Sequence, residues 1–179
     1  MIVIEHKTNL TKAEQEQIFA LLTSCNEDFF PPLSSRASST DGNFSKAEKQ
    51  LPTAYFKSIL DQYFILAWLE DKIVGFSAYI HQYANELIPT APLSNYVTTT
   101  CIRPEFRGQG ISKQLNDYLE NDLPAATDCK VITRRTWSSN TIQIQNLSQR
   151  GYCILKEIEH DRGPNISTLY YILHSSLRS

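Results

Sequence analysis

The sequence predicts an α/β fold in which a mixed sheet of about seven strands is flanked by about four helices. One observation is the order of the hydrophobic patterns along the chain, which is β, α, α, β, β, β, α, β, α, β, β. Another is a glycine-containing turn past mid-chain, which joins a strand rich in β-branched residues to an amphipathic helix. No internal repeat or domain boundary interrupts this order, so we expect residues 1–179 to form a single domain.

The first third of the chain is predicted to contain one strand and two helices. Residues 2–6 form the strand. Thr11 and Glu14 have the spacing of a capping box and open the first helix, which ends before a pair of prolines. Residues 31–45, rich in Ser, Pro, Asp and Gly, are expected to form a loop, and residues 53–62 the second helix. The buried face of the first helix is expected to carry Ile18, Leu21, Leu22 and Cys25.

The middle of the chain is predicted to contain three strands. Residues 63–70 and 72–82 form two of them, with a tight hairpin turn at Asp71 and Lys72. A loop at residues 85–94 leads to the third strand at residues 96–102.

The remaining elements alternate between helix and strand. The predicted helices are residues 112–123 and 140–150, the latter stopped by Gly151, and the predicted strands are residues 130–137, 152–159 and 166–173. On the helix at residues 112–123 we expect Ile111, Leu115, Tyr118 and Leu119 to face the core and Lys113, Asn116, Asp117 and Glu120 to face water.

The composition excludes several classes of protein. With 41% hydrophobic and 20% charged residues the chain is typical of a folded domain, and its net charge of −2 argues against general nucleic-acid binding. The four histidines and four cysteines show no metal-ligand spacing, so no metal is expected. Cys101 and Cys153 lie in predicted strands, where a buried free thiol is expected. The first six residues are too short and too soon acidic for a signal peptide, and no apolar run is long enough to span a membrane, so we expect a cytoplasmic protein.

The glycine-containing turn at residues 107–112 carries the strongest functional signal. A strand that breaks into such a turn and then starts a helix leaves several main-chain N–H groups unpaired at the positive end of the helix dipole. This arrangement favours phosphate or pyrophosphate, and Gly108 and Gly110 let a ligand approach the backbone. The spacing fits neither a P-loop nor the G-x-G-x-x-G dinucleotide fingerprint.

The same turn resembles the R/Q-x-x-G-x-G/A signature of the GNAT superfamily of N-acetyltransferases, with Ser112 where the family usually has Gly or Ala. Residues 140–152 resemble a second family segment, N-x-x-A-x-x-x-Y-x-x-x-G-F. Gln143 replaces its alanine, and Leu147 replaces the tyrosine that many members place near the thiol of coenzyme A as a general acid. The element order is also that of the GNAT fold, whose mixed sheet is splayed.

The resemblance implies acetyl-CoA as the co-substrate. It implies that the strand before the turn binds the pantetheine arm through its backbone and that the turn binds the pyrophosphate. Asn140 is expected to cap its helix, to contact the cofactor, or to do both. The implied binding residues are Thr100, Cys101, Ile102, Arg107, Gly108, Gln109, Gly110, Ile111, Ser112 and Asn140.

Acetyl transfer to an amine requires a proton acceptor, because an ammonium group has no lone pair. His81 is chemically the best base if its ring faces the cleft. Tyr96 and Thr98 stand where members of the family often place a base or a water-holding residue, and Tyr96 suits a donor or water holder better. Tyr79 lies on the same predicted strand as His81. A polar or aromatic residue at a strand end with no catalytic role is the alternative for each of these residues. His160, Asp161 and Arg162 lie on a loop that often borders the acceptor site in the family, or they form an exposed polar turn.

Three functions follow as hypotheses. The first is an acetyl-CoA-dependent N-acetyltransferase that transfers acetyl directly to an amine of a small molecule, or of a protein, as a monomer or homodimer. The second, motivated by Leu147, is a non-catalytic acyl-CoA-binding sensor or assembly module. The third is a nucleotide-binding protein that uses the same turn.

Overall fold

The structure is a computed structural model that describes residues 1–36 and 51–174. Its strands form a seven-stranded mixed sheet with the order β1-β2-β3-β4-β5-β7-β6, which confirms the predicted fold class. The chain divides into two compact units, residues 1–78 with 99–122 (unit 1) and residues 79–98 with 123–179 (unit 2). That both belong to one domain stays a prediction. The elements are β1 (Ile2–Lys7), α1 (Lys12–Ser24), α2 (Thr53–Ile59), β2 (Tyr63–Leu69), β3 (Lys72–Tyr83), β4 (Ser94–Ile102), α3 (Ile111–Asn121), β5 (Val131–Trp137), α4 (Thr141–Gln149), β6 (Cys153–Ile158) and β7 (Thr168–His174).

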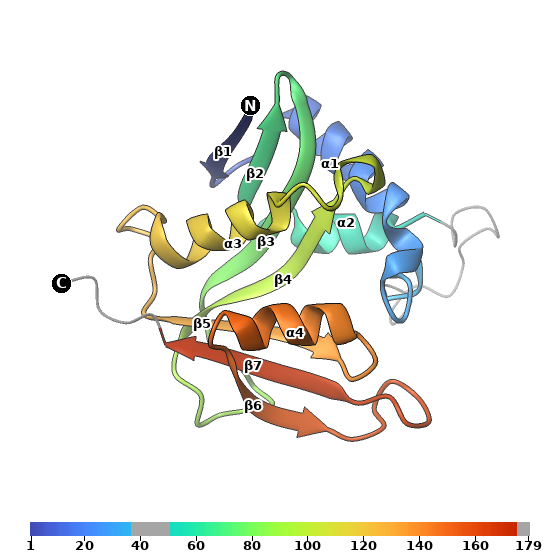
Figure 1. The fold of residues 1–179 in the computed structure, drawn as a ribbon, viewed down its shortest axis with the longest axis vertical. Coiled ribbons are helices and arrows are strands. Elements are labelled where there is room, and N and C mark those ends of the chain that lie inside the picture. The colour runs from blue at the N-terminus through green and yellow to red at the C-terminus, as the bar shows by residue number, and fades with distance from the viewer. Residues whose placement is uncertain (37–50, 175–179) are drawn as a thin grey trace. The chain divides into compact units, whose positions relative to one another are not determined.

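Unit 1 packs helices on both faces of its strands. Figure 1 shows α3 on one face and α1 and α2 on the other. α1 starts at the predicted capping box, where the Thr11 N–H donates to Glu14 Oε2 at 2.7 Å and the Glu14 N–H donates to Thr11 Oγ1 at 3.3 Å. Burial of the apolar face of α1 against β2 and β3 removes hydrocarbon from water and stabilises the unit. This core contains Ile18, Leu21, Leu22, Cys25, Leu33, Ile59, Phe64, Leu66, Ile73, Phe76, Ala78 and Cys101.

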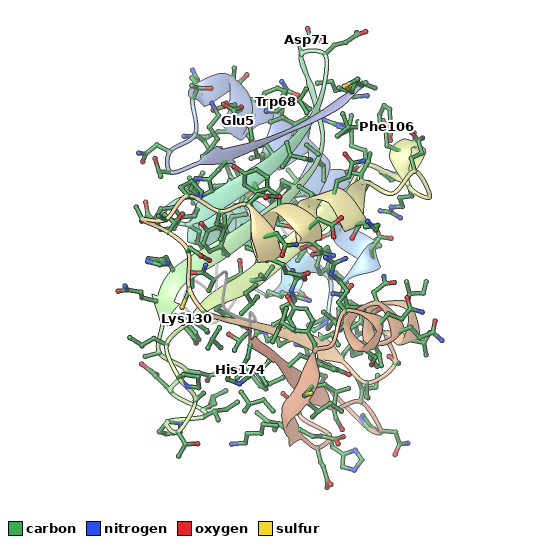
Figure 2. The ribbon with its side chains drawn as sticks, turned by 60° about the vertical axis from the view of Figure 1, so that its left-hand side comes forward. Glu5, Trp68, Asp71, Phe106, Lys130 and His174 are labelled. Atoms are coloured by element: carbon green, nitrogen blue, oxygen red, sulfur yellow. The ribbon has the colours of Figure 1, made fainter. Side chains whose placement is uncertain are left out.

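The β2–β3 hairpin turns one residue earlier than predicted. Glu70 adopts a left-handed conformation (φ 55°) and forms the turn with Asp71, whereas Lys72 already belongs to β3. Figure 2 shows Asp71 at the tip of this hairpin. Gln17 of α1 holds the tip from the side, because its Nε2 donates to the Asp71 carbonyl at 3.0 Å and its Oε1 accepts from the Ile73 N–H at 2.8 Å.

Unit 2 is built on the β5–β7 ladder. β7 pairs antiparallel with β5 and with the outer strand β6. β4 pairs parallel with β5 at only three positions, residues 95–97 with residues 132–134. α4 ends as predicted, since Gly151 is left-handed (φ 84°) and the Tyr152 N–H reaches back to the Leu147 carbonyl at 3.0 Å.

The structure corrects three local predictions. α2 ends at Ile59 rather than at residue 62, because the chain turns there to enter β2. Asn116 is buried rather than exposed, because the buried stripe of α3 also takes in the position next to Leu115. Cys153 is exposed, because it lies on the outer strand β6.

The predicted loop at residues 31–45 is described only as far as residue 36, and the rest lies outside the described residues. Within the described part, Leu33–Ser35 forms a short 3₁₀ turn.

Candidate functional site

The glycine-containing turn of unit 1 has the predicted geometry. β4 ends at Ile102, a 3₁₀ turn spans Pro104–Phe106, and α3 begins after its N-cap residue Gly110. Gly108 and Gly110 are both left-handed, with φ of 74° and 77°. L-residues with a side chain adopt this conformation only at a cost, which explains the two glycines. We call the main chain of residues 107–113 the cradle.

The N–H groups of the cradle point to an external acceptor. Within the described part of the chain, no protein acceptor faces the N–H groups of residues 108–113, and the N-cap residue supplies no side-chain hydrogen bond. A Cβ built on Gly108 or Gly110 would meet no atom within 4 Å. The two glycines therefore face open space, where a Cβ would occupy part of any ligand's volume. These residues fit a diphosphate group.

Arg107, the first residue of the signature, is held by its own unit. Its guanidinium pairs with Asp28 and donates to Cys25 Sγ at 3.4 Å, and its Nε donates to the Ile102 carbonyl at 3.2 Å. These bonds fix the entry to the cradle. The sequence analysis missed Cys25 and Asp28 as partners, because each lies about 80 residues before Arg107 and no local pattern joins them.

The two buried cysteines of unit 1, Cys25 and Cys101, shift each other's thiol pKa. The hydrogen bond with the Cys101 thiol is the main cause that lowers the pKa of Cys25 to about 7, and Ser24 and Arg107 act in the same direction. Burial opposes this change. Burial also raises the pKa of Cys101, as does its contact with Cys25. The cluster therefore favours a thiolate at Cys25 beside the Arg107 guanidinium.

Gly75 on β3 is a second feature that the sequence analysis missed. A Cβ at this position would stand 2.6 Å from Ile102 Cδ1, 3.2 Å from the Cys101 carbonyl oxygen and 3.2 Å from Ile111 Cγ2. The absent side chain lets the end of β4 and the start of α3 pack directly on β3. No signal in the sequence distinguishes this glycine from one that merely weakens a strand.

The end of β4 in unit 1 carries the residues expected to bind the pantetheine arm. The Thr100 and Ser77 hydroxyls are 3.0 Å apart, and Cys101 is buried. The Ile102 carbonyl accepts from Arg107 Nε and from the Cys25 thiol at 3.5 Å. The role of this segment in cofactor binding stays a prediction.

In unit 2, hydrogen bonds define which nitrogen of His81 carries a proton. The Asn95 side chain is fully buried, and its Nδ2 donates to the Thr127 carbonyl at 2.9 Å. Asn95 Oδ1 is therefore the acceptor in the 2.7 Å contact with His81 Nδ1. Neutral His81 consequently bears its proton on Nδ1, and its basic lone pair lies on Nε2.

The structure separates His81 from the other candidate proton-handling residues. Successive residues of a strand face opposite sides, so Asn95 and its partner His81 lie on one face of β4, and Tyr96 and Thr98 on the other. Tyr96 is stacked on Tyr83 at a ring-centroid distance of 4.6 Å, although Tyr83 lies two residues after His81, because left-handed Gln82 (φ 52°) interrupts the alternation of β3 between them. Tyr96 and Thr98 are thus brought together, and His81 is not brought to them.

The α4 segment shows the expected cap and an apolar residue at the departure from the family pattern. Asn140 Oδ1 accepts from the Gln143 N–H at 3.3 Å, which confirms its capping role; a contact with the cofactor stays a prediction. Leu147 is 1% exposed and offers no proton. Behind the helix, buried Arg134 donates through Nε to the Tyr152 hydroxyl at 3.1 Å.

Residues 1–36 and 51–174 contain no group of three or more His, Cys, Asp or Glu side chains placed to hold a metal ion. No helix in these residues is both long and apolar enough to cross a membrane.

Comparison with protein families identifies the class. The sequence profile of the acetyltransferase (GNAT) family matches residues 19–152, which is most of the chain and includes both segments that resemble the family. The protein belongs to the GNAT acetyltransferase family. No curated protein matches the chain as a whole at a significant level.

Solved structures with the same fold include several acetyltransferases. The ribosomal-protein-S18-alanine N-acetyltransferase from Escherichia coli matches with a TM-score of 0.65 at 14% identity, covering 100% of this chain and 97% of its own. An aminoglycoside 6′-N-acetyltransferase complexed with coenzyme A matches with a TM-score of 0.67 at 13% identity, covering 99% of both chains. An N-acetyltransferase from Staphylococcus aureus Mu50 gives 0.65 at 13% identity, covering 98% and 99%. At such identities the likeness establishes the fold alone.

Proposed function

We propose that this protein is an acetyl-CoA-dependent N-acetyltransferase that acts on an amine of a small molecule by direct transfer, without a covalent enzyme intermediate. The observation that carries the proposal is the row of N–H groups at residues 108–113, which have no acceptor within the described chain and lie beside two glycines that face open space. Membership of an acetyltransferase family supports the same reading. We further propose a cytoplasmic monomer or homodimer.

The donor side of the proposed reaction lies in unit 1. The cradle N–H groups would bind the diphosphate, where the α3 dipole favours negative charge. The backbone of residues 100–102 would bind the amide-bearing arm. Acetyl-CoA, when bound, supplies an activated acetyl thioester. No residue of the chain needs to form a bond to the acetyl group.

The state of the cysteines favours direct transfer. Cys101 is buried and its pKa is raised, so it is held as a poorly nucleophilic thiol. Cys25 has a pKa of about 7, but its side chain is 1% exposed and its sulfur is bonded to Arg107. A nucleophile must reach its substrate, and Cys25 is enclosed.

The acceptor side needs a group that takes the amine proton. We propose that Tyr96 and Thr98, which share one face of β4, hold a water that accepts this proton. His81 Nε2 is the competing base, presented on the opposite face. One acceptor amine cannot use both faces, so separate substitutions of Tyr96 and His81 distinguish them.

Calorimetry with a matched pair of glycine variants tests the donor site. Gly110→Ala should weaken acetyl-CoA binding by about 10- to 100-fold, because the added methyl occupies ligand volume. Gly151→Ala is the control, since Gly151 has a similar φ of 84° but caps α4. It carries the same backbone strain and should bind acetyl-CoA normally. Equal affinity in the two variants, or tighter binding of ATP or NAD than of acetyl-CoA to the unmodified protein, would contradict the cradle assignment.

The alternative, an acyl-CoA-binding sensor or assembly module, is favoured by one observation. Leu147 is buried and apolar where many relatives have a proton-donating tyrosine. Thiol release from acetyl-CoA with a panel of amines separates the two functions. Release with any amine supports the transferase, and binding without release on every amine supports the sensor.

A further inference from the structure

One face of the unit 2 sheet gathers arginine and aromatic side chains. Residues directly opposite each other in neighbouring strands lie on the same face, and so do residues two apart. β5 and β7 pair Arg135 with Tyr170 and Trp137 with Thr168. The face that contains these four residues, together with Tyr96 and Arg162, is called the arginine face below.

The β4–β5 register places Tyr96 on the arginine face. Tyr96 is the parallel partner of Thr133, which lies two residues before Arg135 on β5. The Ser94 hydroxyl is 2.6 Å from the Thr133 hydroxyl, so the side chains of these two strands meet on this side. The residue proposed to hold the proton-accepting water therefore shares a face with the arginines.

Arg162 reaches the arginine face from the loop between β6 and β7. Its guanidinium carbon lies 5.8 Å from the centroid of the Trp137 ring, and its Nε donates to Thr168 Oγ1 at 2.7 Å. Trp137 and Arg135 are two residues apart on β5, a separation of about 7 Å. Two guanidinium groups from different elements thus approach each other on one face.

The loop that presents Arg162 is ordered by its own hydrogen bonds. The Arg162 N–H donates to the Ile166 carbonyl at 3.2 Å. Asp161 accepts from the Thr168 N–H and from the Thr168 hydroxyl, both at 2.8 Å. These bonds fix Arg162 before any ligand binds, which lowers the entropic cost of binding.

The electrostatics of the face favour an anion. Loss of water contact lowers the pKa of Arg162, and the nearby charge of Arg135 lowers it further, while Asp161, Tyr96 and Tyr170 oppose this. Asp161, the carboxylate next to Arg162 in the chain, already accepts two hydrogen bonds from Thr168. An added anion would relieve the repulsion between the guanidinium groups. Arg135 is exposed and Arg162 half-buried, so a solute has access to both.

We propose that the arginine face binds the carboxylate of the acceptor, so that the substrate class is an amine that also carries a carboxylate group. This inference rests on the proposed function and names its substrate class. The planar guanidinium forks match a carboxylate geometrically. A phosphate dianion is less suitable, because removing two charges from water beside Trp137 and Tyr170 costs more than removing one.

Two variants and a control test the assignment through binding. Arg162→Gln and Arg135→Gln should weaken calorimetric binding of amino acids by about 10- to 100-fold, because each loses a charged hydrogen bond. Their affinity for acetyl-CoA should not change. Lys130→Gln removes the same charge from an exposed position immediately before β5 and should leave both affinities unchanged. Arg162→Lys keeps the positive charge but loses the planar guanidinium, so its affinity for amino acids should lie between those of the unmodified protein and Arg162→Gln. Thermal melts check that each variant is folded.

Matched amines complete the test. Amino acids should bind the unmodified protein and release thiol at lower KM than their carboxamides, although the carboxamides have the less basic amines. Equal binding of acids and amides, or an unchanged amino-acid affinity in both arginine variants, overturns the inference, as does a preference for aminophosphates. Arginine-dependent binding of amino acids without any thiol release would sustain the anion site and reject the transferase function.

Discussion

The cradle of unit 1 and the arginine face of unit 2 are both proposed to bind anions, and they are built from different atoms. The cradle uses the main-chain N–H groups of six consecutive residues, 108–113, and two glycines that keep side chains away. The arginine face uses side chains from β4, β5, β7 and the β6–β7 loop. Binding through main-chain N–H groups depends little on which side chains the residues carry. Binding at the arginine face depends on the chemical group of each side chain.

Because of this difference, the cradle and the arginine face should contribute differently to ligand specificity. N–H groups at a helix start recognise any phosphate-like group of suitable size, so the cradle suits a ligand common to a whole family. The Arg162 guanidinium, held by Trp137 and Thr168, recognises the charge, distance and planarity of a ligand group. The acceptor class should therefore depend on unit 2 and the donor class on unit 1.

The largest expected effect separates the two faces of β4. Tyr96→Phe should lower kcat by about 100-fold, because the water that accepts the amine proton loses a holding group. His81→Gln should change kcat by less than about threefold, because His81 lies with Asn95 on the opposite face. Steady-state thiol release at saturating amine measures both.

A larger loss of kcat in His81→Gln than in Tyr96→Phe would assign the base to His81 Nε2. The proton transfer would then take place away from the arginine face. Asn95→Asp would then provide a further check. A carboxylate partner at His81 Nδ1 stabilises the imidazolium form and should shift the pH profile of kcat upward. With Tyr96 as the water holder, that profile should stay in place.

A smaller effect is expected from closing the space that Gly75 leaves under the cradle. Gly75→Ala brings a methyl to 2.6 Å from Ile102 Cδ1 and should destabilise the protein by about 1–3 kcal/mol while weakening acetyl-CoA binding. Adding Ile102→Val removes that Cδ1 atom and should restore part of both losses. Urea unfolding and calorimetry on the single and double variants give the coupling energy. Strict additivity of the two substitutions would mean that this contact does not support the cradle.

The sequence predicted the parts of the molecule that depend on neighbouring residues. Thr11 and Glu14 identify a helix start because the capping box closes over three residues. The cradle was predicted in the same way, because strand, glycine turn and helix are consecutive. In residues 1–36 and 51–174 the order of strands and helices was predicted correctly for a similar reason, since each pattern is local.

The contacts that the sequence did not reveal depend on the register of strand pairing and on residues that are far apart in the sequence. Nothing near Arg107 in the sequence indicates that Asp28 and Cys25 hold its guanidinium. The loop with Arg162 was recognised as a candidate, but its meeting with Trp137 follows only from the β5–β7 register. The burial of Asn116 and the exposure of Cys153 likewise depend on what the neighbouring elements cover.

An effect of similar size, which bears on neither proposed ligand directly, is a pH dependence of stability that arises in unit 1. The pKa of Cys25 is about 7 in the folded protein, below the ordinary thiol value of 9.0. Between these two pH values the unfolded chain binds more protons than the folded chain, so stability rises with pH. The contribution is complete above pH 9 and is lost as the pH falls through 7, with a slope of at most about 1.4 kcal/mol per pH unit.

Denaturant titrations under reducing conditions at pH 6, 7, 8 and 9 measure this contribution. Relative to Cys25→Ala, the unmodified protein should gain stability from pH 7 to 9, and Cys101→Ala should reduce the gain because it removes the main cause of the lowered pKa. Cys153→Ala, at an exposed position of β6, is the control and should run parallel to the unmodified protein. A stability difference between the unmodified protein and Cys25→Ala that stays constant over this range would mean that Cys25 is a neutral thiol and that Asp28 alone supplies the charge that holds Arg107 beside the cradle.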